Sequence, residues 1–166
     1  MKKSLFVVMF LCLLVAASFA GTVNVSGRAG MFNHGTGSTS MMYGVSADYG
    51  ITENVSLRGA VDTTTYDSGG VSTTYMPISV DVIYHQTFSG MITPYAGAGL
   101  SYNSMTVAGS TNSTTGYQGE VGVKFSLGGM TAGVEYRVIF PDASKSTSFT
   151  SSSVYIQGGF SQSFNI

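Results

Sequence analysis

The sequence has few of the residues that mark several common classes of protein. Only 9% of its 166 residues are charged, whereas a typical soluble domain has about 25%. Lys and Glu are too scarce for a coiled coil. With three prolines, 10 Tyr and 10 Phe, the chain also lacks the composition of a disordered protein, which is poor in aromatic residues. The formal net charge of −1 offers no basic surface for nucleic acid.

Cysteine and long apolar runs are also nearly absent. The single Cys12 argues against a disulfide scaffold or a thiolate metal cluster. The one apolar run, residues 5–17, follows Lys2 and Lys3 and precedes small residues that end at Ala20. This pattern predicts a secretory signal peptide over residues 1–20, because a membrane-anchor helix would need about 20 apolar residues. The mature domain is then residues 21–166.

The mature domain alternates apolar and polar side chains, which is the period of a β-strand. Eight segments show the alternation, and none shows a helical period. Each has about the 9–11 residues that a tilted membrane strand needs. The segments are residues 22–32, 40–51, 55–65, 76–84, 92–102, 115–125, 130–140 and 153–164.

The connections between these segments alternate in length. Residues 52–54, 85–91 and 126–129 form short connections, while residues 33–39, 66–75, 103–114 and 141–152 form longer ones rich in Ser, Thr and Gly. Short periplasmic turns and longer extracellular loops are typical of outer-membrane barrels. The pattern predicts an all-β fold, an eight-stranded antiparallel up-and-down transmembrane β-barrel.

Alternation alone does not say which face points outward, since a soluble β-sandwich or small barrel has the same period with its apolar face inside. The polar face here is mostly Gly, Ser, Asn and Gln. Its charged residues nearly balance, as an enclosed lumen requires; they are Arg28, Asp48, Arg58, Asp62, Asp81, Glu120, Lys124, Glu135 and Arg137. Both features favour a lipid-facing apolar exterior.

Aromatic residues on the apolar face lie near the strand ends, as in the interfacial girdles of membrane barrels. They are Tyr43, Tyr49, Tyr84, Tyr102, Tyr117, Phe125, Phe140 and Phe164. Closure into a barrel is then expected, because an open sheet edge cannot be hydrogen-bonded in lipid. Side chains just fill the interior of an eight-stranded barrel.

Three stretches carry a resemblance to a known family: residues 94–100 (PYAGAGL), residues 134–137 (VEYR) and the aromatic-rich last segment. With the signal peptide and eight amphipathic segments, the chain resembles the small outer-membrane β-barrel proteins. That group includes the OmpX-like, OmpW-like and opacity-like barrels and the membrane domain of OmpA. The resemblance implies a Gram-negative outer membrane, contact with its lipids and lipopolysaccharide, and insertion by the barrel assembly machinery. The chain departs from the family by ending Phe164-Asn165-Ile166, without a terminal aromatic residue.

Candidate catalytic residues are few. A Ser-His-acid hydrolase, as in lipid-A-deacylating barrels, needs its three groups within hydrogen-bond reach. His34 has Ser38 and Ser40 nearby but no carboxylate in its loop, and His85 is expected as an interfacial turn residue at the opposite end. A metal site would need three or four clustered ligands. We therefore expect no catalytic residue, cofactor or metal.

The sequence favours a monomeric, non-enzymatic barrel with a structural or surface-interaction role, in which extracellular loops contact a host or surface ligand. A narrow pore or carrier for small hydrophobic molecules, resembling OmpW-like barrels, is the main alternative. A lipid-modifying enzyme and a soluble secreted β-protein are further alternatives. The turn at residues 52–54 places Asp48 opposite Arg58. Asp81 lies near the same level, so we expect Arg58 to be held between Asp48 and Asp81.

Overall fold

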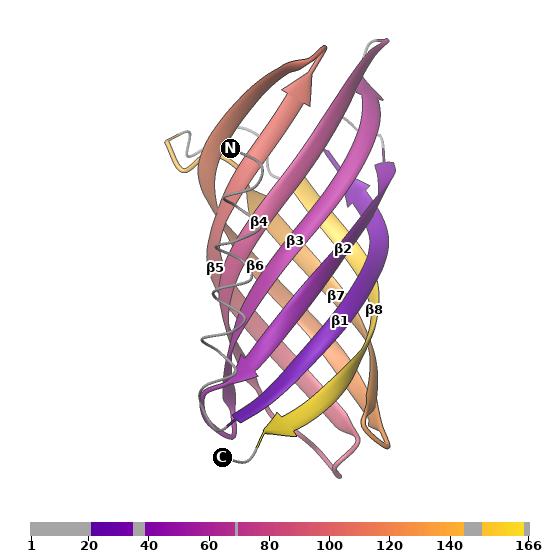
Figure 1. Ribbon diagram of the computed structural model, residues 1–166, viewed down its shortest axis with the longest axis vertical. Helices are drawn as coiled ribbons and strands as arrows, with labels where there is room; N and C mark the ends of the chain where they lie inside the picture. Colours follow the sequence, from indigo (N-terminus) through magenta and orange to yellow (C-terminus); the bar gives the residue numbers. More distant parts are fainter. Residues whose placement is uncertain (1–20, 35–38, 69, 145–150, 165–166) are drawn as a thin grey trace.

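The predicted barrel is confirmed in a computed structural model that describes residues 21–34, 39–68, 70–144 and 151–164. The predicted signal peptide lies outside the described residues. Eight antiparallel strands pair in chain order, and β1 pairs with β8 to close the barrel (Figure 1). The strands are β1 (Gly21–Asn33), β2 (Thr39–Gly50), β3 (Val55–Ser68), β4 (Val71–His85), β5 (Ile92–Val107), β6 (Ser110–Leu127), β7 (Met130–Phe140) and β8 (Ser151–Phe164).

The two ends of the barrel differ in their connections. At one end, called the turn end, β1 begins, β8 ends and the connections are residues 51–54, 86–91 and 128–129. Gly128 and Gly129 both have positive φ angles, which lets two residues reverse the chain between β6 and β7. The opposite end, called the hairpin end, holds the other four connections. No helix among the described residues is long and apolar enough to cross a membrane.

Two of the predicted long loops are wrong. Residues 66–75 and 103–114 continue the strands of the β3–β4 and β5–β6 hairpins almost to their tips. Ala108 and Gly109 alone connect β5 to β6, both with positive φ, as in a tight hairpin turn. Threonine explains the error. Its polar side chain made these segments resemble loops, yet its branched side chain favours strands. Thr106 and Thr111 hydrogen-bond across the hairpin at 2.8 Å.

These extended hairpins form a four-stranded sheet that rises beyond the rest of the barrel. Pairing of β6 with β7 begins only at Tyr117 and Phe140, whereas β6 stays paired with β5 up to Ser110. The seven residues 110–116 therefore extend β6 by roughly 24 Å along its own direction. β3, β4 and β5 extend with it, and both hairpins stand above the neighbouring strands in Figure 1.

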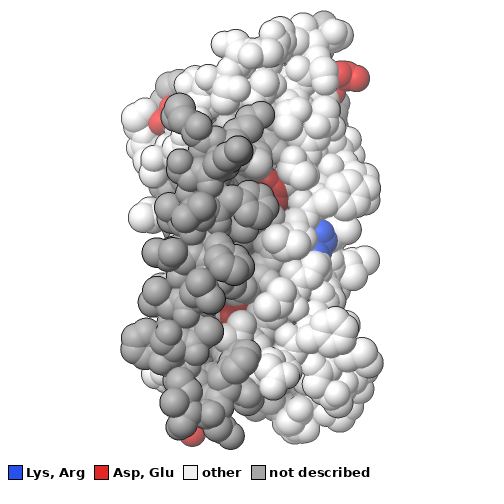
Figure 2. Space-filling model, in the orientation of Figure 1, with Lys and Arg blue, Asp and Glu red and all other residues white. Residues whose placement is uncertain are grey.

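The outer surface of the barrel wall is apolar. Leu100, Ile156 and Phe160 are 65–73% exposed, and Figure 2 shows a face with only scattered charged side chains. On β6 the outward apolar positions run from Tyr117 to Leu127, about 26 Å of height for strands tilted by about 40°. That height matches the band of about 25 Å on outer-membrane barrels. A soluble barrel would bury this face, so the structure supports the lipid-facing assignment.

The predicted interfacial aromatic residues lie at both ends of this apolar band. Tyr43, Tyr102, Tyr117 and Phe140 lie toward the hairpin end, and Tyr117 stacks on Phe140 with ring centroids 4.7 Å apart. Tyr49, Tyr84 and Phe125 lie toward the turn end. The side chain of Phe164 lies outside the described residues.

Candidate functional site

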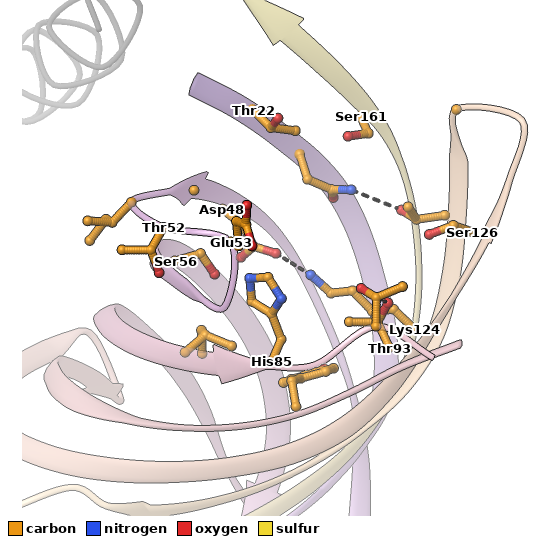
Figure 3. A pocket seen from close by; sticks show the side chains of 18 of the residues that line it. Thr22, Asp48, Thr52, Glu53, Ser56, His85, Thr93, Lys124, Ser126 and Ser161 are labelled. Carbon is orange, nitrogen blue, oxygen red and sulfur yellow. Dashed lines mark hydrogen bonds and ion pairs between the residues drawn. The ribbon is translucent and has the colours of Figure 1, made fainter. Parts of the chain in front are cut away.

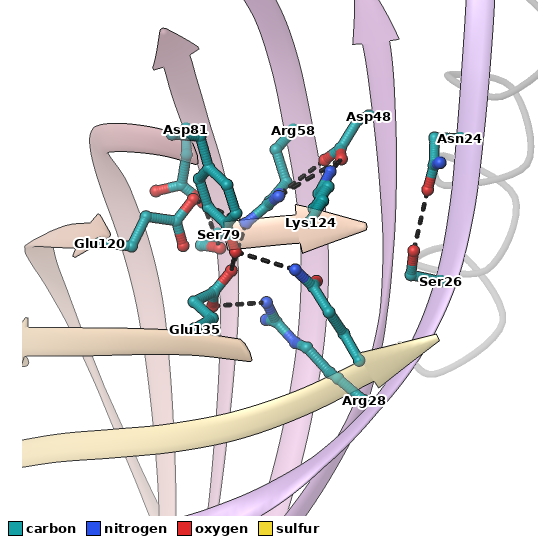
Figure 4. Close-up of polar contacts among 12 residues, drawn as sticks. Asn24, Ser26, Arg28, Asp48, Arg58, Ser79, Asp81, Glu120, Lys124 and Glu135 are labelled. Atoms are coloured by element: carbon teal, nitrogen blue, oxygen red, sulfur yellow. Dashed lines mark hydrogen bonds and ion pairs between the residues drawn. The ribbon is translucent and has the colours of Figure 1, made fainter. Parts of the chain in front are cut away.

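The centre of the lumen holds a layer of charged side chains (Figure 4). The structure places all nine charged residues singled out in the sequence on the inner face. Eight are buried: Arg28, Asp48, Arg58, Asp62, Asp81, Glu120, Glu135 and Arg137. Lys124 is half-buried. Since every strand except β5 and β8 contributes at least one of them, the layer connects the walls of the barrel across its axis.

Arg58 lies at the middle of this layer. Its Nε donates to Asp48 Oδ1 at 2.6 Å, and its Nη1 donates to Glu120 Oε1 at 2.8 Å and also to Glu135. Asp48 also accepts a hydrogen bond from Lys124. One guanidinium therefore holds carboxylates from β2, β6 and β7, which fixes strands on opposite sides of the lumen.

Two further arginines extend the layer toward the hairpin end. Arg28 Nε donates to Asp62 Oδ1 at 2.7 Å, and Arg137 donates to Glu120 and forms an ion pair with Glu135 at 3.0 Å. The guanidinium of Arg28 also lies 4.8 Å from the ring centre of Tyr155. Because these charges are desolvated, their mutual pairing is what makes their burial tolerable.

The predicted role of Asp81 is wrong. Backbone register does place Arg58 opposite both Asp48 and Asp81, as expected. The Arg58 side chain, however, contacts Asp48, Glu120 and Glu135. Asp81 instead accepts hydrogen bonds from Gln118 at 2.7 Å and Ser79 at 2.9 Å. The guanidinium extends across the lumen, where two carboxylates lie, and so does not reach along the wall to β4.

Inward glycines make room for the larger side chains of this layer. A Cβ on Gly99 would collide with Asp81 and with the carbonyl oxygen of Val80, and a Cβ on Gly122 would collide with the Tyr95 ring. Tyr95 uses this space to donate to Glu135 at 2.7 Å. Gly99 is therefore a packing feature of β5.

An apolar cluster that the sequence analysis missed seals the lumen on the hairpin side of the charged layer. It consists of Phe32, Met42, Tyr75, Ile139 and Tyr155, with Tyr66 and Met105 packed against it. The rings of Phe32 and Tyr75 stack at 5.3 Å, and the Tyr75 hydroxyl donates to Asn103 at 2.6 Å. Phe32, Met42, Ile139 and Tyr155 lie within the predicted segments, at inward positions where the alternation led us to expect polar side chains.

His34 closes the hairpin side of this cluster. It directly follows β1, but it is 3% exposed instead of lying in an open loop. Its ring stacks on Tyr66 with centroids 4.2 Å apart and planes 9° apart. Ser38 lies outside the described residues. Ser40 hydrogen-bonds to Thr64. The ring is therefore packed as part of the seal.

On the other side of the charged layer, the lumen opens into a polar vestibule at the turn end (Figure 3). Its volume is about 650 Å³, and Asp48, Lys124 and Tyr95 lie at its inner end. Hydroxyl groups line much of the wall, including those of Thr22, Ser56, Thr93, Ser126 and Ser161.

His85 also lines this vestibule, as the last residue of β4. Its expected position as a residue of the interfacial turn is therefore wrong. The error arose because the apolar alternation in the sequence stops at Tyr84, one residue before the strand ends. Among the described residues, no three His, Cys, Asp or Glu side chains are grouped to hold a metal ion.

Comparison with solved structures supports the fold. Neisserial surface protein A is 17% identical with a TM-score of 0.64; the match covers 84% of this chain and 96% of that one. The N-terminal β-barrel domain of Pseudomonas aeruginosa OprF is 21% identical with a TM-score of 0.60, covering 86% and 99%. Yersinia pestis Ail, solved with the heparin analogue sucrose octasulfate, is 11% identical with a TM-score of 0.60, covering 87% and 100%.

The sequence itself gives a family match but no curated relative. No curated protein matches the chain significantly. The family model described as "Outer membrane protein beta-barrel domain" matches residues 4–150, which is most of the chain and includes seven of the eight strands. The protein therefore belongs to the outer membrane protein β-barrel domain family.

Proposed function

We propose that this protein is a non-enzymatic outer-membrane barrel that acts at the cell surface through its hairpin end. The observation that carries the proposal is the four-stranded sheet formed by the extended hairpins of β3–β4 and β5–β6. Membership in an outer membrane protein family supports an outer membrane as the location. With the short turns toward the periplasm, as is usual for such barrels, this sheet extends outward from the cell.

The chemistry of the projecting sheet supports a role in contact. Its outward positions carry hydroxyl side chains, among them Thr65, Thr74, Thr106 and Thr111, which pair across the hairpins. Asp67 is the one charged residue in the hairpin segments 66–75 and 103–114. A surface of hydroxyls with a single charged residue, on a rigid, hydrogen-bonded sheet, favours hydrogen bonding to a partner at little cost in ordering.

The same proposal accounts for the sealed lumen. The charged layer and the apolar cluster connect the walls of the barrel and make it a rigid support for the sheet. His34 is stacked on Tyr66 within this seal, which supports a packing role in place of proton transfer to a substrate.

The test shortens the hairpins without changing the barrel. Met105 and Asn112 face each other, so residues 106–111 can be replaced by Asn-Gly, which favours a two-residue hairpin turn. Tyr66 and Thr73 also face each other, so residues 67–72 can be replaced by Asn-Gly in the same way. Cells that display the shortened protein should adhere to host cells or surfaces no better than cells without it, while heat-modifiable gel migration stays normal. Glu53→Gln, at the turn end, is the control. Adhesion equal to that of the full-length protein after both exchanges would refute the proposal.

The vestibule favours a second function, a narrow pore or carrier. A polar space of about 650 Å³ that opens at the turn end provides part of a path across the membrane. The charged layer and the apolar cluster occupy the other half, so transport would require both to rearrange. We therefore rank transport second.

A further inference from the structure

The turn end has an unusually apolar sector on one side. The turn at residues 86–91 and the turn between β6 and β7 carry four large apolar side chains that are each more than half exposed: Phe88, Met91, Leu127 and Met130. Residues 86–94 and 125–134 include no charged residue. The opposite sector of the same end carries exposed Thr22, Glu53, Asn54 and Ser161, with Ile51 as one apolar exception.

Between these turns lies an apolar groove of about 330 Å³. It is lined by Ser89, Met91, Ile92, Phe125, Ser126 and Leu127. Ile92 and Phe125 face each other at the lower edge of the lipid-facing wall. The groove therefore continues the apolar outer surface of the barrel and extends it beyond the strand ends.

Several backbone groups of the turn at residues 86–91 are hydrogen-bonded within the protein. Phe88 N donates to Ile92 O at 2.7 Å and Ile92 N donates back to Phe88 O at 3.1 Å, while Ser126 N donates to Met91 O at 2.8 Å. Gly90 and Ser89 have positive φ angles that make this tight turn possible. Each backbone group that is paired within the turn lowers the cost of entering lipid, where unpaired groups are costly, and the turn carries no charge that would oppose insertion.

We propose that the two turns insert into the membrane leaflet next to the turn end and that the groove holds an acyl chain of a phospholipid from that leaflet. The inference rests on the proposed function, in which the barrel spans a membrane. The acyl chain is the occupant because the groove is continuous with the lipid-facing wall and offers no charged partner to a protein. The polar turn at residues 51–54 stays at the surface of the leaflet, so the two sides of the barrel enter it to different depths.

Tryptophan fluorescence tests the depth of each turn, because the protein has no native tryptophan. Phe88→Trp and Met130→Trp report on the two apolar turns, and Asn54→Trp reports on the polar turn as matched control. Val121→Trp, on the exposed outer wall of β6, reports on the spanning barrel itself. Each variant is folded into phosphatidylcholine vesicles with or without brominated lipid. The bromines lie on the acyl chain near the headgroup for the turn variants and near the end of the acyl chain for Val121→Trp.

We expect blue-shifted emission from Phe88→Trp and Met130→Trp, and quenching by brominated lipid severalfold stronger than for Asn54→Trp. If Phe88→Trp and Met130→Trp are quenched no more than Asn54→Trp while Val121→Trp is quenched, the barrel spans the membrane but the inference is wrong. The apolar turns are then available to a periplasmic protein. If Val121→Trp is also unquenched, the spanning barrel itself is refuted. Because two independent turn variants are used, misfolding of one leaves the test intact.

Discussion

Arg58 on β3 lies opposite Asp48 on β2, and its guanidinium Nε donates to the Asp48 carboxylate at 2.6 Å. Both side chains are buried. The remaining guanidinium nitrogens extend to Glu120 and Glu135 on the far wall. The register of the β2–β3 hairpin thus positions the Arg58 guanidinium so that it joins opposite sides of the lumen.

Removal of Arg58 is expected to destabilise the barrel strongly. Arg58→Ala leaves Asp48, Glu120 and Glu135 with fewer cations in a desolvated space, at a cost of about 3–5 kcal/mol. Urea unfolding in detergent micelles, followed by heat-modifiable gel migration, measures the change. Lys124→Ala is the control: Asp48 keeps Arg58, so the loss of stability should be clearly smaller than for Arg58→Ala. Equal stability of Arg58→Ala and wild type would contradict the pairing described.

The glycines provide a test of lumen packing. Gly99→Ala places a methyl group against Asp81 and the Val80 carbonyl, and overpacking of this kind costs about 1–3 kcal/mol. Gly59→Ala, on the outer wall of β3, meets nothing within 4 Å and should be neutral or slightly stabilising. Urea midpoints of the two variants in the same detergent compare them directly. A stable Gly99→Ala protein would show that β4 and β5 are less closely packed than the structure indicates.

Much of this architecture was accessible from the sequence. Period-two alternation gave the eight strands and their faces, because a lipid-facing wall demands apolar residues at every second position. The Asp48–Arg58 register also followed, since a short turn at residues 52–54 permits few alternatives. The pairing of two strands joined by a short turn is therefore determined by the residues of that hairpin.

Contacts across the lumen were less accessible. Whether Arg58 meets Asp81 or Glu135 depends on the stagger of all eight strands around the barrel, which no single hairpin determines. The inward apolar residues Phe32, Met42 and Tyr75 were missed for a different reason. These three side chains are apolar but point into the lumen, whereas the alternation assigns apolar side chains to the outer face. All three lie near the hairpin end.

Orientation in the membrane can be tested by cysteine labelling. Cys12 lies in the predicted signal peptide, so the mature chain offers no other thiol. Ala108→Cys, at the tip of the β5–β6 hairpin, should react with a membrane-impermeant maleimide on intact cells. Asn54→Cys, in the turn at the opposite end, should react only after the outer membrane is permeabilised. The reverse pattern would invert the topology and remove the projecting sheet from the cell surface.

The barrel is expected not to conduct as an open pore. Two seals lie in series: the layer around Arg58 and Arg137, whose side chains are fully buried, and the cluster around Tyr75 and Phe32. Eight strands leave an interior that side chains fill, whereas aqueous channels appear at about 16–18 strands. The charges also pair across the lumen and do not form a ring of one sign, which an ion-selective pore would use. The vestibule, about 650 Å³ at the turn end, offers space for water.

Single-channel recording in planar bilayers measures this directly. The wild type should show no steady conductance, and a Gly122→Leu variant, whose side chain enters the space of the Tyr95 ring, should be indistinguishable from it. Arg58→Ala weakens one seal but leaves the cluster around Tyr75, so it should give at most brief openings. Large steady conductance in the wild type, reduced reproducibly by Gly122→Leu, would mean that the lumen is open and that transport, not surface contact, is the main function.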